Sequence, residues 1–135
     1  MKGMGEIADL ERRLREFISK VSSDFGVSAP TIELHSPEEL EMYFTGGSEV
    51  AGWYSSDEEK IILNSEFADL ETVLHEYAHH LQFLRSGRDL GKAFPFYEST
   101  KPHCERGFER EAKGFALAYR EFYYNTWRKI TGRER

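Results

Sequence analysis

Residues 75–79 read His-Glu-Tyr-Ala-His, an H-E-x-x-H sequence inside a segment with helical periodicity. Positions four residues apart on a helix share one face, so His75 and His79 can direct ring nitrogens at the same metal ion. Glu76 lies beside them, where a carboxylate can take a proton from a water molecule held at that ion. The stretch therefore predicts a zinc site with its own general base, and it places that site on a helix.

The segment around the motif predicts an amphipathic helix from about residue 66 to residue 85. Ser65 is a favourable N-cap, and Glu66 and Asp69 place acidic side chains in the first turn. An apolar stripe follows at helical spacing, at Leu70, Val73, Leu74, Tyr77, Leu81 and Leu84. At about 100° per residue, the stripe and the two histidines fall on roughly opposite faces. We expect the helix to pack through its leucines while both histidines face open space.

A third metal ligand is expected downstream, because catalytic zinc usually takes three protein ligands and keeps one position for water. Residues 105–123 form a second amphipathic pattern, with an apolar stripe at Phe108, Ala112, Phe115, Tyr119 and Phe122. Glu109 and Glu111 flank this stripe, and either could reach the histidines if the two helices pack. His103 and Glu105 are further candidates, and the spacing alone does not choose among the four.

An H-E-x-x-H helix followed by a later helix that opens with Glu-x-x-Ala resembles the gluzincin metallopeptidases. Residues 109–116 read Glu-Arg-Glu-Ala-Lys-Gly-Phe-Ala and are similar to the glutamate helix of ImmA/IrrE-like and related small gluzincins. In that pattern the first glutamate is the third zinc ligand, which implies Glu109 rather than Glu111. The pattern usually continues with Asp or Asn after the alanine, where this chain has Lys113. The resemblance covers about residues 50–123, and in size and order the chain is most similar to the single-domain minigluzincins.

This resemblance implies a zinc metallopeptidase that hydrolyses peptide bonds in a peptide or protein substrate. Zinc would be held by His75, His79 and Glu109, and Glu76 would serve as the general base. A second electrophile usually helps to stabilise the oxyanion. Four residues could supply it, and the sequence does not choose among them: His80, His103, Tyr119 and Tyr123.

Two alternatives keep the same fold. The first is a latent or very selective enzyme, in which the long segment 86–105 or the C-terminal segment from Tyr124 covers the site. The second is a non-catalytic, zinc-containing regulatory or interaction module. Glu76 favours the enzyme, because a purely structural site does not need this glutamate and would favour four protein ligands.

The composition predicts one globular domain spanning residues 1–135. Hydrophobic residues make up 39% and aromatic residues 14%, which argues against disorder. A net charge of −6 without a basic stripe argues against nucleic-acid binding.

No apolar run approaches the ~20 residues that span a bilayer, and residues 1–6 lack the apolar core of a secretory signal. A single cysteine, Cys104, allows no internal disulfide. We expect a cytoplasmic protein without membrane partners, and the sequence leaves its oligomeric state open.

The order of the remaining segments predicts an α+β, zincin-like fold. We expect a helix at 6–22, a strand at 31–35, a helix to about 43, a hairpin of strands at 50–55 and 60–63, a loop at 86–105 and a closing helix at 105–130. Ser36 and Glu39 form a capping box for the short helix. Helices should cover one face of a small, mainly antiparallel sheet. By the resemblance, an edge strand at residues 52–54 would line the cleft and could receive an extended peptide.

Overall fold

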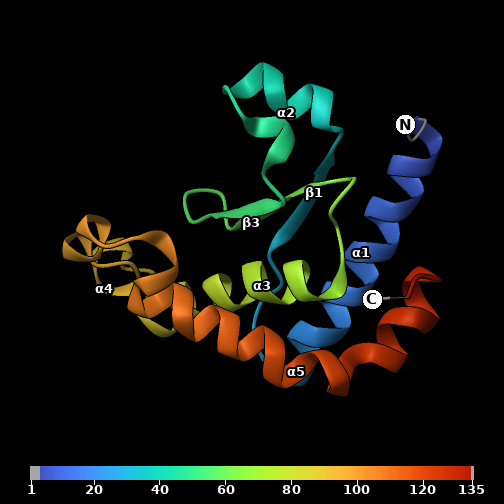
Figure 1. Cartoon of the computed structure of the whole chain (residues 1–135). Coiled ribbons are helices and arrows are strands. Elements are labelled where there is room, and N and C mark those ends of the chain that lie inside the picture. The colour runs from blue at the N-terminus through green and yellow to red at the C-terminus, as the bar shows by residue number, and fades with distance from the viewer. Residues whose placement is uncertain (1–3, 135) are drawn as a thin grey trace.

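The computed structural model describes residues 4–134, which contain five α-helices, three short 3₁₀ helices and three β-strands. The helices and strands are α1 (Met4–Phe25), β1 (Thr31–His35), α2 (Pro37–Tyr43), β2 (Gly52–Ser55), β3 (Lys60–Asn64), α3 (Leu70–Arg85), α4 (Leu90–Ala93) and α5 (Gly107–Thr131). The expected α+β class is confirmed (Figure 1). No helix in this part of the chain has the length and apolar character needed to cross a membrane. The expectation about a secretory signal rests partly on residues 1–3, which lie outside the described residues.

The sheet is mixed, so the expected mainly antiparallel sheet is wrong. Its strand order is β1-β3-β2, with β3 parallel to β1 and antiparallel to β2. The β2–β3 hairpin forms as expected, but its second strand enters the middle of the sheet beside β1. Between β1 and the hairpin the chain passes through α2, and such a crossover is what parallel pairing requires. Strand β2 is therefore an edge strand, hydrogen-bonded to β3 on one side.

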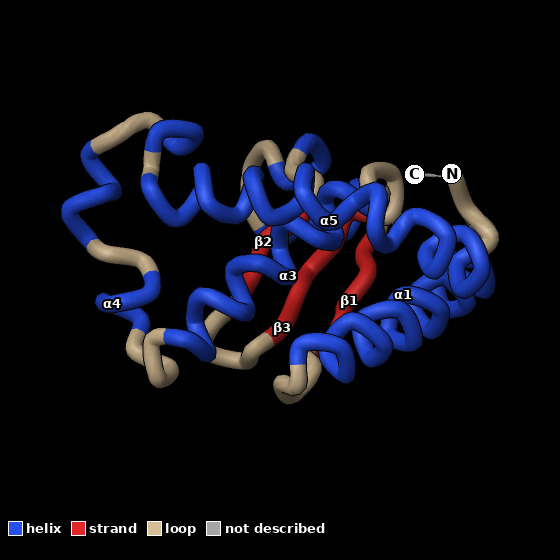
Figure 2. Tube along the Cα trace, turned by 90° about the horizontal axis from the view of Figure 1, so that it is seen from below, coloured by secondary structure: helices blue, strands red, loops and turns tan. Residues whose placement is uncertain are grey.

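Helices α1 and α3 pack against one face of the sheet, and α5 lies across both of them on the side away from the strands (Figures 1 and 2). Side chains of all these layers meet in one hydrophobic core. Ile61 and Leu63 of β3 point to the same side of the sheet and are fully buried. One side of α1 is likewise buried, at Leu10, Leu14, Phe17, Ile18 and Val21. Helices covering one face of the sheet are thus confirmed.

Helix α3 begins at Leu70, four residues later than expected, and its N-cap is Asp69 rather than Ser65. The Asp69 carboxylate accepts a hydrogen bond from the backbone N–H of Thr72 at 2.8 Å. Upstream, the Asn64 side chain accepts from the N–H of Glu66 at 3.0 Å, which closes a turn before the helix. Ser65 and Asp69 are both suitable caps, and tertiary context selects the later one.

The buried face of α5 matches the expected stripe only in part. Phe122 is 70% exposed, whereas Tyr123 and Trp127 are buried. Two alanines, Ala112 and Ala116, complete this buried face. Ala112 belongs to the expected stripe, and two further members of it, Phe115 and Tyr119, pack against the core, so the expectation is wrong at Phe122.

The segment 86–105 contains more structure than the expected loop. It holds α4, the 3₁₀ helix η2 (Phe96–Thr100) and the 3₁₀ helix η3 (His103–Glu105). The Asp89 side chain caps α4 by accepting from the N–H of Lys92 at 3.1 Å. These short helices lie beyond the C-terminal end of α3, at the left of Figure 1, and lead the chain back to the start of α5.

Trp127→Ala should lower the free energy of unfolding by about 3–5 kcal/mol, the usual cost of removing a large core aromatic. Trp127 is fully buried and makes an edge contact with Phe17, with ring centroids 5.2 Å apart. Chemical denaturation followed by far-UV circular dichroism measures the change. The matched control is Phe122→Ala on the same helix, which should cost about 1 kcal/mol or less because the ring is largely in water. Equal losses in the two variants would contradict the packing of α5 described above.

Candidate metal and catalytic site

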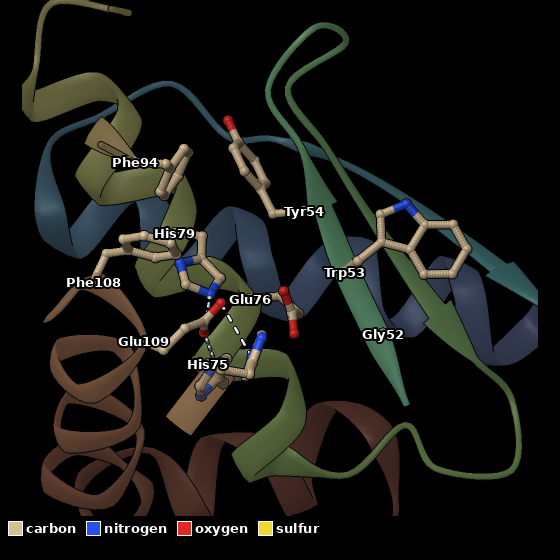
Figure 3. Close-up of a pocket in the computed structure, with 10 residues that line it drawn as sticks. Gly52, Trp53, Tyr54, His75, Glu76, His79, Phe94, Phe108 and Glu109 are labelled. Carbon is tan, nitrogen blue, oxygen red and sulfur yellow. Dashed lines mark hydrogen bonds and ion pairs between the residues drawn. The ribbon is translucent and has the colours of Figure 1, made fainter. Parts of the chain in front are cut away.

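Helices α3 and α5 bring three possible metal ligands to one point. The Nε2 atoms of His75 and His79 lie 3.0 Å and 2.9 Å from the same carboxylate oxygen, Oε1 of Glu109 (Figure 3). The ligand atoms of these three residues all lie within 4.8 Å of one another. Glu111 points elsewhere, because its carboxylate accepts hydrogen bonds from Gln82. Of the four candidates for a third ligand, the structure joins Glu109 to the histidines.

These residues fit a zinc ion. Zinc in proteins takes imidazole nitrogen and carboxylate oxygen at about 2.0–2.2 Å, so tetrahedral ligand atoms lie about 3.4 Å apart. The two ring nitrogens already lie 2.9 Å and 3.0 Å from one glutamate oxygen, so a small outward shift makes room for the ion. A set of two histidines and one glutamate also leaves a tetrahedral ion one open position, as in catalytic zinc sites.

The charge of Glu109 is stabilised by the histidines. Burial by itself favours the neutral carboxyl, but the hydrogen bonds from His75 and His79 outweigh it and hold the pKa of Glu109 well below its usual range. Burial favours neutral His79 as well, and the bond to Glu109 outweighs it so that the pKa of His79 is raised. Glu109 is thus ionised at neutral pH, which is the form that binds a metal.

The expectation that both histidines face open space is wrong for His79, which is only 6% exposed. Its ring packs against Phe94 and Phe108, with centroid distances of 5.6 Å and 6.1 Å. His75 is partly exposed and faces the cleft. The apolar surroundings of His79 come from the segment after α3 and from the start of α5, which a periodicity argument within one helix does not include.

Glu76 is 8% exposed, and within residues 4–134 no side chain or backbone group hydrogen-bonds its carboxylate. Burial raises its pKa, although the neighbouring histidines oppose the rise. It lies between the histidines and strand β2 (Figure 3). At Gly52 an added Cβ would lie 2.9 Å from the Ile62 carbonyl oxygen and 3.6 Å from Cγ of Glu76. Glycine therefore lets the strand pass close to this carboxylate.

A cleft of about 220 Å³ opens over the four residues. As expected, edge-strand residues 52–54 form one wall, and Phe94, His103 and Phe108 lie on the other sides. This volume suits one or two peptide side chains rather than a large cofactor. The segment 86–105 therefore borders the site, as one hypothesis required. No residue after Glu109 lines this cleft, so the C-terminal segment from Tyr124 does not cover it in the described part of the chain.

The four candidates for a second electrophile differ in whether they reach the cleft. His103 borders the cleft, with its Nε2 3.2 Å from Oε2 of Glu109. The phenol of Tyr123 instead donates to Asp24 at 2.9 Å, and Tyr119 packs within the aromatic side of the core. Neither tyrosine lines the cleft.

His80, the fourth candidate, is fully buried and does not line the cleft. Its Nδ1 is 2.8 Å from the phenol oxygen of Tyr54, and its Nε2 is 2.8 Å from the backbone carbonyl of Ser28. Because a carbonyl only accepts, Nε2–H donates to Ser28 and Nδ1 accepts from Tyr54. Burial lowers the pKa of His80, consistent with this neutral form. His80 is therefore not placed to act as the second electrophile, and its hydrogen bonds are structural.

Sequence reasoning missed three residues of the site: Gln82, Phe94 and Phe108. Gln82 accepts a hydrogen bond from His79, and its position three residues after that histidine on the same helix was the signal that could have revealed it. Phe108 was expected in the apolar stripe of the closing helix but not at the metal site. Phe94 had no signal, because it reaches the cleft through the irregular segment after α3.

Comparison of the chain with protein-family models, with curated proteins and with solved structures gives no match. Function is therefore inferred from the chemistry and geometry of the site.

Proposed function

We propose that the protein is a zinc-dependent peptidase with a zincin-like fold, similar to the gluzincins. One observation carries the proposal: three ligand atoms from His75, His79 and Glu109 converge in a cleft that is also lined by the largely buried Glu76. A general base must lie within reach of the attacking water, that is, beside the metal ligands and in the same cleft. Glu76 is the carboxylate in that position.

The metal ligands and Glu76 would have separate roles in peptide hydrolysis. Zinc, when bound by the two histidines and Glu109, supplies the activation of water and the polarisation of a carbonyl that hydrolysis needs. Glu76 accepts the proton that the attacking water loses as its oxygen bonds to the peptide carbon. It then delivers this proton to the amide nitrogen as the C–N bond breaks. A pKa raised by burial brings Glu76 closer to neutral pH, where proton transfer in both directions is efficient.

The proposed substrate is an extended segment of a peptide or protein. Strand β2 has one edge paired to β3 and the other beside the cleft, which permits main-chain hydrogen bonds to an added strand. Phe94 and Phe108 provide an apolar wall for a substrate side chain. His103, the one electrophile candidate at the cleft, would stabilise the oxyanion. The single cysteine, Cys104, suits a reducing compartment, and we place the reaction in the cytoplasm.

The proposal is tested first on the wild-type protein. We expect one bound zinc per chain by elemental mass spectrometry. We also expect cleavage of a mixed peptide library that stops with 1,10-phenanthroline and returns when zinc is added back. Failure to hold zinc after reconstitution would overturn the metal site. Zinc without any cleavage would reject the active peptidase and favour the latent or non-catalytic module.

A further inference from the structure

We propose that Gln82 is a positioning residue for the metal site. It fixes the ring of His79 and ties that ring to the start of α5, so that His79 and Glu109 reach the metal together. The inference deepens the proposed function and rests on it, because it concerns how the same zinc site is held.

The amide of Gln82 has a defined orientation. Its nitrogen donates to the backbone carbonyl of Phe108 and to a carboxylate oxygen of Glu111, both at 2.8 Å. Carbonyl and carboxylate oxygens only accept, so the NH₂ group must face them and the amide oxygen must face the other way. That oxygen is Oε1, which lies 2.8 Å from Nδ1 of His79.

This orientation determines the tautomer of His79. An amide oxygen accepts, so Nδ1 of His79 carries the proton and donates it to Gln82. The other ring nitrogen, Nε2, donates to Glu109 2.9 Å away, and it is the nitrogen that remains to bind a metal once that proton is lost. A hydrogen bond at the remote nitrogen orients a metal-binding imidazole and raises its basicity. Gln82 therefore prepares His79 to bind metal through Nε2.

The same amide also connects the two helices that carry the ligands. Phe108 and Glu111 lie on either side of Glu109 at the start of α5, where the structure gives the helix no side-chain N-cap. Gln82 lies on α3, is only 4% exposed, and holds this turn through two hydrogen bonds. Arg85 supports the same turn by donating to Glu111 at 2.9 Å. Gln82 therefore links the position of His79 to that of Glu109 through direct hydrogen bonds.

Gln82→Leu tests this role, because leucine is of similar size and has no hydrogen-bonding group. We expect zinc affinity, measured by competition with a chromogenic chelator, to fall about 10–100-fold, as is typical when a hydrogen bond to a ligand histidine is removed. The rescue variant is Gln82→Glu combined with Glu111→Gln. It keeps an acceptor for His79 and gives the second carboxylate oxygen an amide donor, but it also turns that oxygen toward the Phe108 carbonyl, so affinity should return only part of the way to wild type and stay clearly above that of Gln82→Leu.

A second measurement reports on the tautomer directly. In ¹⁵N-labelled, zinc-loaded wild type, long-range ¹H–¹⁵N spectra should show His79 protonated at Nδ1, with a slowly exchanging, downfield proton. Gln82→Leu should shift that proton upfield and speed its exchange, which a merely structural loss elsewhere would not do. If Gln82→Leu does not fold, the wild-type spectrum and the rescue variant still decide the question.

The two proposals fail in different ways. Absence of zinc from the wild type would reject the proposed function. A wild type that binds zinc beside a folded Gln82→Leu of equal affinity would reject the positioning role alone. A His79 protonated at Nε2 in the zinc-loaded wild type would do the same.

Discussion

Glu76→Gln should reduce kcat/KM for peptide cleavage by about 10²–10⁴-fold, the range expected when a general base is lost. Glutamine has nearly the shape of glutamate, but its amide does not accept a proton from water. Glu76 is not among the three residues whose ligand atoms converge, so bound zinc should stay at wild-type stoichiometry. The loss should therefore lie in the chemical step, with kcat falling far more than KM changes. A quenched fluorescent peptide chosen from the library gives the rates.

The control for this variant is Glu16→Gln, which removes a carboxylate exposed on α1, a helix that does not line the cleft. It should cleave the peptide at the wild-type rate. Zinc content is measured on both variants by elemental mass spectrometry. If Glu76→Gln keeps its zinc and cleaves within threefold of wild type, Glu76 is not the base. If Glu76→Gln loses zinc, the substitution has disturbed the metal ligands. A lower cleavage rate would then not report on proton transfer, and the rate must be measured on a zinc-loaded sample.

The sequence was most informative where a feature depends on neighbours in the chain. Ser36 and Glu39 form the expected capping box, and β1 spans the expected residues 31–35. His75 and His79 share a face of α3, because four residues make about one helical turn. These features need only local hydrogen bonds and helical geometry, which residue identity determines directly.

Features that depend on distant contacts were not predictable in the same way. The placement of β3 between β1 and β2 is decided by which side of the sheet the hairpin enters. His80 is buried because Tyr54 and Ser28, far away in sequence, supply its two hydrogen-bond partners. Helical spacing left Glu109 and Glu111 open as ligands, and only the resemblance favoured the first. The choice depends on how α5 is rotated against α3.

Glu109→Ala should lower zinc affinity by more than about 100-fold, since loss of a ligand should exceed the 10–100-fold effect of losing a hydrogen bond to one. It removes one of three ligands and also the only carboxylate that contacts both histidines among the described residues. Glu111→Ala should cost only several-fold, because Gln82 retains the Phe108 carbonyl as a partner. Competition with a chromogenic chelator measures both variants against wild type. The reverse order of losses would assign the ligand to Glu111.

Glu111 as the third ligand would also be incompatible with the way α5 packs in the hydrophobic core. Residues two apart on a helix differ by about 200° in direction, so presenting Glu111 to the histidines requires turning α5 by roughly that angle. Glu109 and Trp127 are 127 − 109 = 18 residues apart, which is about five helical turns, so they point the same way. Trp127 is fully buried, and the rotation would carry it out of the core. The packing that buries Trp127 at one end of α5 therefore directs Glu109 to the histidines at the other.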